Sequence, residues 1–118
     1  MPREYRHALD DMLEAVVGIT HATAGKTLDD YKSDWVLKHA VQRGIEIISE
    51  ASRALPEDLQ AERPEIPWRQ VRTIGNVLRH EYHGLSDTII WRVVTDELPR
   101  LREALTWLQR RAPEDGTH

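Results

Sequence analysis

The 118-residue sequence contains no cysteine and no phenylalanine. Without thiols the chain can form no disulfide, and it offers neither a cysteine nucleophile nor thiolate ligands for zinc. It also has no apolar run approaching the ~20 residues that a membrane-spanning helix requires, and its first residues, MPREYRHALDD, contain no apolar signal segment. These absences predict a cytoplasmic protein with no membrane association.

Aromatic packing depends on four tryptophans and three tyrosines, because phenylalanine is missing. We expect the tryptophans to lie in the core or at an interface, since large rings contribute most when they are removed from water. Trp91, near the start of a predicted helix, could instead stack on an RNA base. The four are Trp35, Trp68, Trp91 and Trp107.

The net charge of -4 is unevenly distributed along the chain. Residues 1–62 hold 7 lysines and arginines against 12 acidic residues, whereas residues 63–111 hold 9 arginines, no lysine and 6 acidic residues. Arginine carries a planar fork of donors that matches phosphate or carboxylate, so the second half could meet an anionic partner. The same arginines could equally form a solvated helix surface, and charge alone does not decide between the two.

Apolar residues recur every three or four positions, which is the pattern of helices with one buried face. No strand-like alternation occurs. The spacing predicts long helices over residues 5–19, 33–55, 67–84 and 86–108. A capping box between Thr27 and Asp30 predicts a short helix as well.

Glycine, proline and serine mark the predicted helix ends. Gly25 lies in the first connection, and Pro56 closes the second long helix and opens a surface connection with about one helical turn. Gly84 ends the third long helix, and Ser86 caps the last one. Pro99 lies inside that last helix and should kink it or divide it in two.

Four amphipathic helices with short connections predict an all-α fold, an up-and-down four-helix bundle with an additional short helix. A chain of this length has enough residues for one core but not for two. We therefore expect residues 1–111 to form a single domain and residues 112–118 to form a disordered tail.

A polar segment, RQVRTIGNVLRHEYHG, covers residues 69–84. At about 100° per residue one face of this helix carries no apolar side chain, and His80 lies about 40° from that face. The opposite face carries Val71, Ile74 and Leu78. The polar face consists of Arg72, Asn76, Arg79 and His83.

These residue types suit the chemistry of a phosphodiester. Histidine can exchange a proton near neutral pH, arginine can stabilise phosphate charge, and asparagine can orient either group. The alternative is a structural helix whose solvent-facing side carries two histidines. His80 and His83, with His39 as a third ligand, could also hold a metal ion, but no carboxylate completes the set and we expect no metal.

Three further stretches match a known pattern in order and spacing. In HAVQRGIEIISEASRALPED, residues 48–51 (Ile-Ser-Glu-Ala) stand at an isoleucine-glycine-glutamate-alanine signature. IPWRQV, residues 66–71, matches the start of the next long helix, and NVLRHEYHGLSDTIIWRVVTDELPRL matches its end and the final helix. Together they resemble the HepT-like branch of the HEPN superfamily, small helical toxins paired with minimal nucleotidyltransferases.

The catalytic motif of that family is an arginine, four to six residues, a histidine, any residue and a tyrosine. His80 and Tyr82 match the end of this motif, and Asn76 matches the asparagine that usually follows the arginine. Gly75 stands at the usual arginine position, and the other permitted spacings place no arginine there either.

The resemblance implies a HEPN-type bundle that acts as a metal-independent endoribonuclease without a cofactor. Two protomers of a homodimer would bring their motifs together in a cleft. His80 would assist attack by the RNA 2′-hydroxyl, Arg72 or Arg79 would replace the missing arginine at the phosphate, and Asn76 would orient these groups. A cognate nucleotidyltransferase antitoxin would silence the enzyme by transferring AMP to Tyr82.

Two functional hypotheses follow. The first is a HepT-like toxin of a type VII toxin–antitoxin pair that cleaves RNA or tRNA. The second is a catalytically weakened module, with Gly75 in place of arginine, that binds a nucleotidyltransferase or RNA without cleavage. In either case His83 could support the site. Glu50 could be a polar partner of His80 or a surface glutamate.

Overall fold

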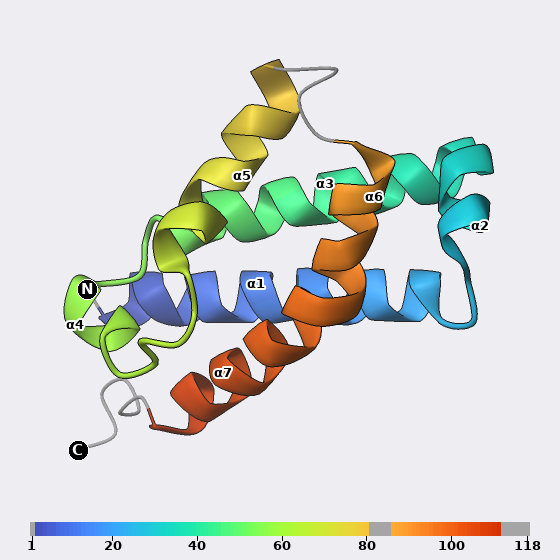
Figure 1. Cartoon of the computed structure of the whole chain (residues 1–118). Coiled ribbons are helices and arrows are strands. Elements are labelled where there is room, and N and C mark those ends of the chain that lie inside the picture. Colours follow the sequence, from blue (N-terminus) through green and yellow to red (C-terminus); the bar gives the residue numbers. More distant parts are fainter. Residues whose placement is uncertain (1, 81–85, 112–118) are drawn as a thin grey trace.

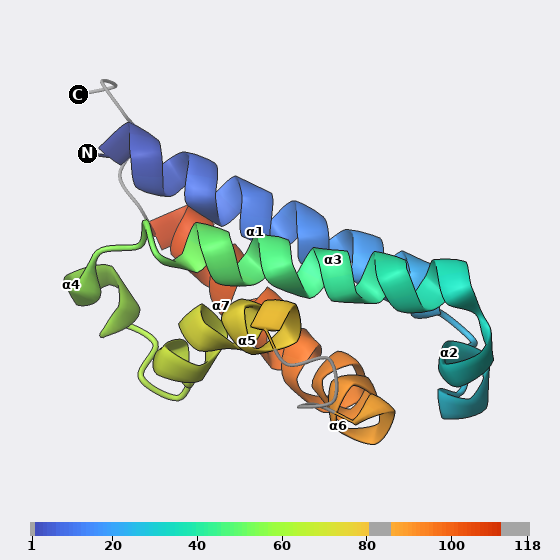
Figure 2. The same cartoon turned by 90° about the horizontal axis from the view of Figure 1, so that it is seen from above.

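The computed structural model describes residues 2–80 and 86–111, and within these ranges the chain forms helices and no strand. Figures 1 and 2 show α1 and α3 side by side along the molecule, with α5 against α3 and α7 against α1. The arrangement confirms the predicted all-α bundle. None of the described helices is long and apolar enough to cross a membrane. The elements are α1 (Pro2–Thr23), α2 (Leu28–Ser33), α3 (Trp35–Ser52), α4 (Glu57–Gln60), α5 (Trp68–His80), α6 (Asp87–Arg92), the π-helix η1 (Val93–Glu97) and α7 (Leu98–Arg111).

The core lies between α1, α3 and α7. Met12 and Val16 of α1, Val41 of α3, and Leu105 and Leu108 of α7 have 0% of their surface exposed. Their helical spacing turns one apolar face of each helix inward. Full burial of such a side chain stabilises the fold by roughly 1.5–3 kcal/mol, so packing of these faces holds the bundle together.

Local hydrogen bonds set the turn between α1 and α3. Gly25 has a φ of 74°, a left-handed conformation that favours glycine. The predicted capping box is present: Thr27 Oγ1 accepts the Asp30 N–H at 3.1 Å, and Asp30 Oδ2 accepts the Thr27 N–H at 2.9 Å. The hydrogen bond from the Thr27 backbone N–H is the largest cause that lowers the pKa of the Asp30 carboxyl group. Asp34 then caps α3, which begins two residues later than predicted.

The connection between α3 and α5 contains the expected single helical turn, α4. The indole N–H of Trp68 donates to the carbonyl oxygens of Gln60 and Arg63, 3.0 Å in each case. The Arg63 guanidinium also forms an ion pair with Glu103 of α7. These contacts fix the start of α5 against the rest of the bundle.

The last part of the chain stays helical through Pro99, because the turn before it is a π-helix, which is wider than an α-helix. Ser86 caps α6 as predicted, because its Oγ accepts the Ile89 N–H at 3.2 Å. Seven residues after Ser86 the chain enters η1, where the Leu98 N–H donates to the Val93 carbonyl. Proline lacks an N–H and crowds the carbonyl four residues before it, so a π-helical turn before Pro99 relieves the conflict. The predicted division of this helix therefore takes the form of α6, η1 and α7.

Two of the four tryptophans lie outside the core. Trp68 is buried, and Trp91 packs against the core with its ring centroid 5.6 Å from that of Tyr31. Trp35 and Trp107, however, are 71% and 40% exposed. The predicted helix end at Gly84 and the predicted tail at 112–118 lie outside the described residues.

Candidate functional site

α5 buries the apolar face that the sequence predicts. Val71, Ile74 and Leu78 pack against the core, whereas Asn76 is exposed on the other side. The helix continues to His80. Because Trp68 anchors its first turn, α5 holds Asn76 toward solvent on a fixed base.

Part of the predicted site lies outside the described residues. These are Tyr82 and His83, and the side chains of Arg79 and His80. The helix backbone alone positions Arg79 and His80, and the roles of all four residues stay predictions.

Ser49 of α3 and Gly75 of α5 meet where the two helices cross. Ser49 Oγ donates to the carbonyl oxygen of Arg72 at 2.8 Å and accepts the N–H of Gly75 at 3.1 Å. A Cβ placed on Gly75 would lie 2.8 Å from both Cβ and Oγ of Ser49, closer than real Cβ atoms approach. This helix crossing therefore requires glycine at position 75 as long as residue 49 is serine.

Both departures from the HepT-like pattern thus lie in one contact. Ser49 stands in place of the signature glycine and Gly75 in place of the motif arginine, and the two residues are 26 positions apart in the sequence. An arginine at 75 has no room beside a serine at 49. Each departure is visible in the sequence, but no local pattern signals that they touch.

Arg72 is held at the N-terminal end of α5. Its Nη1 donates to Gln60 Oε1 at 3.0 Å, and Gln60 is itself buried with its amide nitrogen bonded to the Leu55 carbonyl at 2.9 Å. The rise of the helix separates Arg72 from His80 by about 12 Å. In this conformation the Arg72 guanidinium points to the α4 connection and not to the end of α5.

Arg79 adjoins His80 and lies one turn beyond Gly75 on nearly the same side of α5. Of the two arginines expected to replace the motif arginine, it is the one next to the histidine. Glu50 is exposed on α3. It follows Ser49, which contacts the middle of α5, so the expected contact between Glu50 and His80 stays a prediction.

Within the part of the chain that the structure describes, no three histidine, aspartate or glutamate side chains gather as a set of metal ligands. His39, considered above as a third ligand, has its Nδ1 2.8 Å from the Trp35 carbonyl oxygen. That nitrogen is therefore engaged as a donor. The absence of a metal and of a cofactor stays a prediction.

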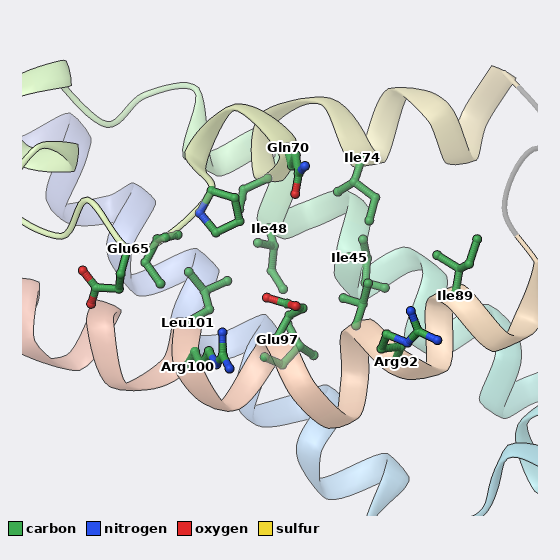
Figure 3. A pocket seen from close by; sticks show the side chains of 15 residues that line it. Ile45, Ile48, Glu65, Gln70, Ile74, Ile89, Arg92, Glu97, Arg100 and Leu101 are labelled. Atoms are coloured by element: carbon green, nitrogen blue, oxygen red, sulfur yellow. The ribbon is translucent and has the colours of Figure 1, made fainter.

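A groove of about 420 Å³ lies on the side of α5 that carries Gln70 and Ile74 (Figure 3). Its floor is apolar and comes from α3, its walls come from α5 and from α6–η1–α7, and charged side chains stand around it. An apolar floor does not suit a phosphodiester, so this groove is separate from the polar face. The labelled lining residues are Ile45, Ile48, Glu65, Gln70, Ile74, Ile89, Arg92, Glu97, Arg100 and Leu101.

The fold and α5 define a small helical bundle with its polar groups gathered on one long helix. Residues 12–107 match the family model described as "Ribonuclease HepT-like". The chain therefore belongs to the HepT-like ribonuclease family of the HEPN superfamily. No solved structure matches it.

Several curated proteins are similar over most of their length. The chain is 34% identical over 102 residues to a Thermococcus cleftensis protein named "Probable ribonuclease HepT", covering 86% of this chain and 93% of that protein. It is 35% identical over 100 residues to a Methanocaldococcus jannaschii protein, covering 84% and 83% of the two chains. A Caldanaerobacter subterraneus protein is 31% identical over 102 residues, covering 86% and 88%. The last two are named provisionally as RNases.

Proposed function

We propose that the protein is the toxin of a type VII toxin–antitoxin pair, an endoribonuclease that cleaves RNA or tRNA without a metal. The family match over residues 12–107 carries this proposal, because that range spans His80 and Tyr82, the residues that we assign to the motif. The named relatives support it, since each is named as a ribonuclease. The substrate places the protein in the cytoplasm.

His80 has the central role in the proposed reaction. As the neutral imidazole it takes the proton of the RNA 2′-hydroxyl while that oxygen attacks the adjacent phosphorus. The bond from phosphorus to the 5′-oxygen breaks, and that oxygen takes up a proton from a protonated imidazole or from water. The products are a 2′,3′-cyclic phosphate and a free 5′-hydroxyl, so atoms and protons balance.

Arg79 is our candidate for the cation at the phosphate. Its place beside His80 favours it over Arg72, which is bonded to Gln60 at the other end of α5. Asn76, exposed on the same helix, orients the phosphate or the imidazole. A guanidinium stabilises the extra charge that the phosphate carries in the transition state.

We further propose that two copies form the site, as a homodimer whose α5 ends share one cleft. A single exposed helix surrounds a substrate on one side only, and a two-fold axis would add an identical polar face opposite it. His83 would support this cleft.

Control by a partner completes the proposal. A cognate minimal nucleotidyltransferase transfers AMP to Tyr82, two residues after His80. The added phosphate brings negative charge and bulk to the place where RNA phosphate must bind, so it blocks cleavage by repulsion and by filling the cleft.

One observation favours a second candidate function. Ser49 closes the position that the motif arginine would occupy, and loss of a charged stabiliser commonly reduces the rate about 100-fold or more. The alternative is a module that binds RNA or the nucleotidyltransferase without cutting.

Incubation of the purified protein with mixed RNA and tRNA in EDTA separates these functions. The parent should cleave, and His80→Ala should lose about 10²–10⁴-fold in rate. Arg79→Ala should lose about 100-fold or more, whereas Arg72→Ala is the matched control and should keep its rate. Absence of cleavage by the parent, with partner binding retained, would establish the non-catalytic module.

A further inference from the structure

α3 carries a row of polar and aromatic side chains beside the line where α5 packs. Counted at 100° per residue from Trp35, the row spans an arc of about 80°. Ser49, which contacts α5, lies just outside this arc. The row consists of Trp35, His39, Arg43, Glu46 and Glu50.

Trp35 combines high exposure with a fixed orientation. It exposes 71% of its surface, and its ring centroid lies 4.1 Å from that of His39 at an interplanar angle of 32°. His39 is itself held, since its Nδ1 donates to the Trp35 carbonyl oxygen at 2.8 Å. One face of the indole is therefore covered by an imidazole, and the other is open to solvent.

The middle of α5 crosses α3 beside this row. Figure 1 shows α5 crossing α3 at a steep angle and rising away from it toward its C-terminal end. Gly75 lies against α3 so closely that a Cβ on it would be 3.4 Å from the Glu46 Cα. The crossing point of the two helices therefore lies about one turn beyond Arg43 along α3.

Nearer its N-terminal end, α3 also contacts the start of α6. Lys38 Nζ lies 3.2 Å from Asp87 Oδ1 at the start of α6. His39 and Arg43 thus occupy the part of α3 between its contacts with α5 and with α6. His80, which ends α5, belongs to the segment that joins those two contacts.

The Arg43 guanidinium forms an ion pair with a carboxylate that a phosphate could replace. Its Nη1 lies 3.1 Å from Glu46 Oε1, and 61% of the arginine side chain is exposed. The arginine side of this pair faces water, which screens its charge, whereas the Glu46 side chain is only 20% exposed. A phosphate can therefore take the place of the carboxylate at the guanidinium fork.

We propose that Trp35, His39 and Arg43 form a binding track for single-stranded RNA, with a base stacked on the open face of Trp35 and a phosphate at Arg43. The proposal rests on the proposed function, because it extends the strand that His80 cleaves. Exposed aromatic rings between cations hold single strands without regard to sequence. Duplex RNA gains nothing from such a ring, because its bases are already stacked on one another.

The test measures RNA affinity in the full chain with His80→Ala, which leaves the strand intact. Fluorescence anisotropy with a labelled single-stranded oligonucleotide gives Kd. Trp35→Ala should weaken binding about 5- to 150-fold, and Trp35→Phe should keep most of the affinity because it keeps a ring. Arg43→Ala should weaken binding and flatten its salt dependence.

Trp107→Ala is the matched control. Trp107 is also exposed, but the Arg63 guanidinium lies over its ring at 5.3 Å. Its loss should leave Kd unchanged, as should Trp35→Ala when the RNA is a duplex. Unchanged single-strand affinity of Trp35→Ala overturns the track, and if that variant instead lowers the mass of the assembly in light scattering, the ring belongs to a protein interface.

The outcomes also separate this proposal from the proposed function. A parent protein that neither binds nor cleaves RNA ends both. A parent that cleaves RNA, together with a Trp35→Ala variant of equal affinity and equal KM, ends the track alone.

Discussion

The Ser49 hydroxyl makes two hydrogen bonds to the backbone of α5. Each such bond contributes about 0.5–1.5 kcal/mol. Glycine at position 75 gives up roughly 1 kcal/mol of helix propensity relative to alanine. The close packing of two helices offsets that loss, so contact between elements outweighs local preference here.

Gly75→Ala should therefore destabilise the protein by about 1–3 kcal/mol, because the new methyl group overlaps Ser49. Urea unfolding measures this change. Gly18→Ala is the control, since Gly18 is exposed on α1 with nothing within 4 Å of a Cβ. It should stabilise by about 0.5–1 kcal/mol. In a Ser49→Gly background the cost of Gly75→Ala should largely disappear, and strictly additive losses would contradict the overlap.

Tyr31 is a fully buried phenol at the junction of α2, α3 and α6. Burial raises its pKa, and the hydrogen bond from Gln42 Nε2, 3.3 Å long, opposes that shift. In the unfolded chain the phenol ionises near pH 10. Its contribution to stability is therefore complete below about pH 10 and is lost as the pH rises toward the higher pKa of the folded state.

The free energy of unfolding should accordingly fall above pH ~10. Tyr31→Phe removes the ionisable group, so the variant should lose less stability between neutral and alkaline pH than the parent. At neutral pH it should be weaker by only about 0.5–1.5 kcal/mol, the value of its hydrogen bond. Urea midpoints across the pH range test this, and equal alkaline losses in both proteins would refute it.

At the scale of helices, the sequence predicts what local spacing and local caps determine. The apolar stripes of α1 and α3, the Thr27 box and the Ser86 cap all follow from residues within one or two turns. The end of α1 is less predictable, because Thr23 bonds back to the Ile19 carbonyl at 2.8 Å and extends the helix. The contact of Ser49 with Gly75 depends on where two helices cross, and no local pattern encodes that point.

α2 shows how much a cap contributes to a short element. Six residues form too few internal hydrogen bonds to be stable alone. Thr27→Ala should cost about 1 kcal/mol, because the Asp30 N–H loses its acceptor. Thr27→Ser keeps the oxygen and should keep most of the stability. Urea unfolding compares the two, and equal losses would show that the methyl group, not the hydrogen bond, stabilises this turn.

At the scale of the whole molecule, the chain is elongated. Its extents are 51 × 28 × 22 Å. α5 packs against α3 and leaves the apolar groove open between itself and α6–η1–α7 (Figure 3). The polar face of α5 and the apolar groove therefore lie on different sides of one helix, and a partner can bind either side without covering the other.

If two copies share the catalytic cleft, light scattering should give twice the 13.7 kDa mass of the chain. Specific ribonuclease activity should then fall on dilution, because separated protomers lack half of each site. A single-chain mass with activity per molecule independent of concentration would contradict a shared cleft.

The fit of residues 49 and 75 also limits the order in which such a chain can have evolved. Starting from glycine at 49 and arginine at 75, serine could not arise first without meeting the arginine side chain, whereas the loss of arginine leaves a gap that serine can fill later. We therefore expect the guanidinium to have been lost before the hydroxyl was gained. Relatives should carry glycine with arginine, glycine with glycine, or serine with glycine at these two positions, and lineages with serine and arginine together should be missing.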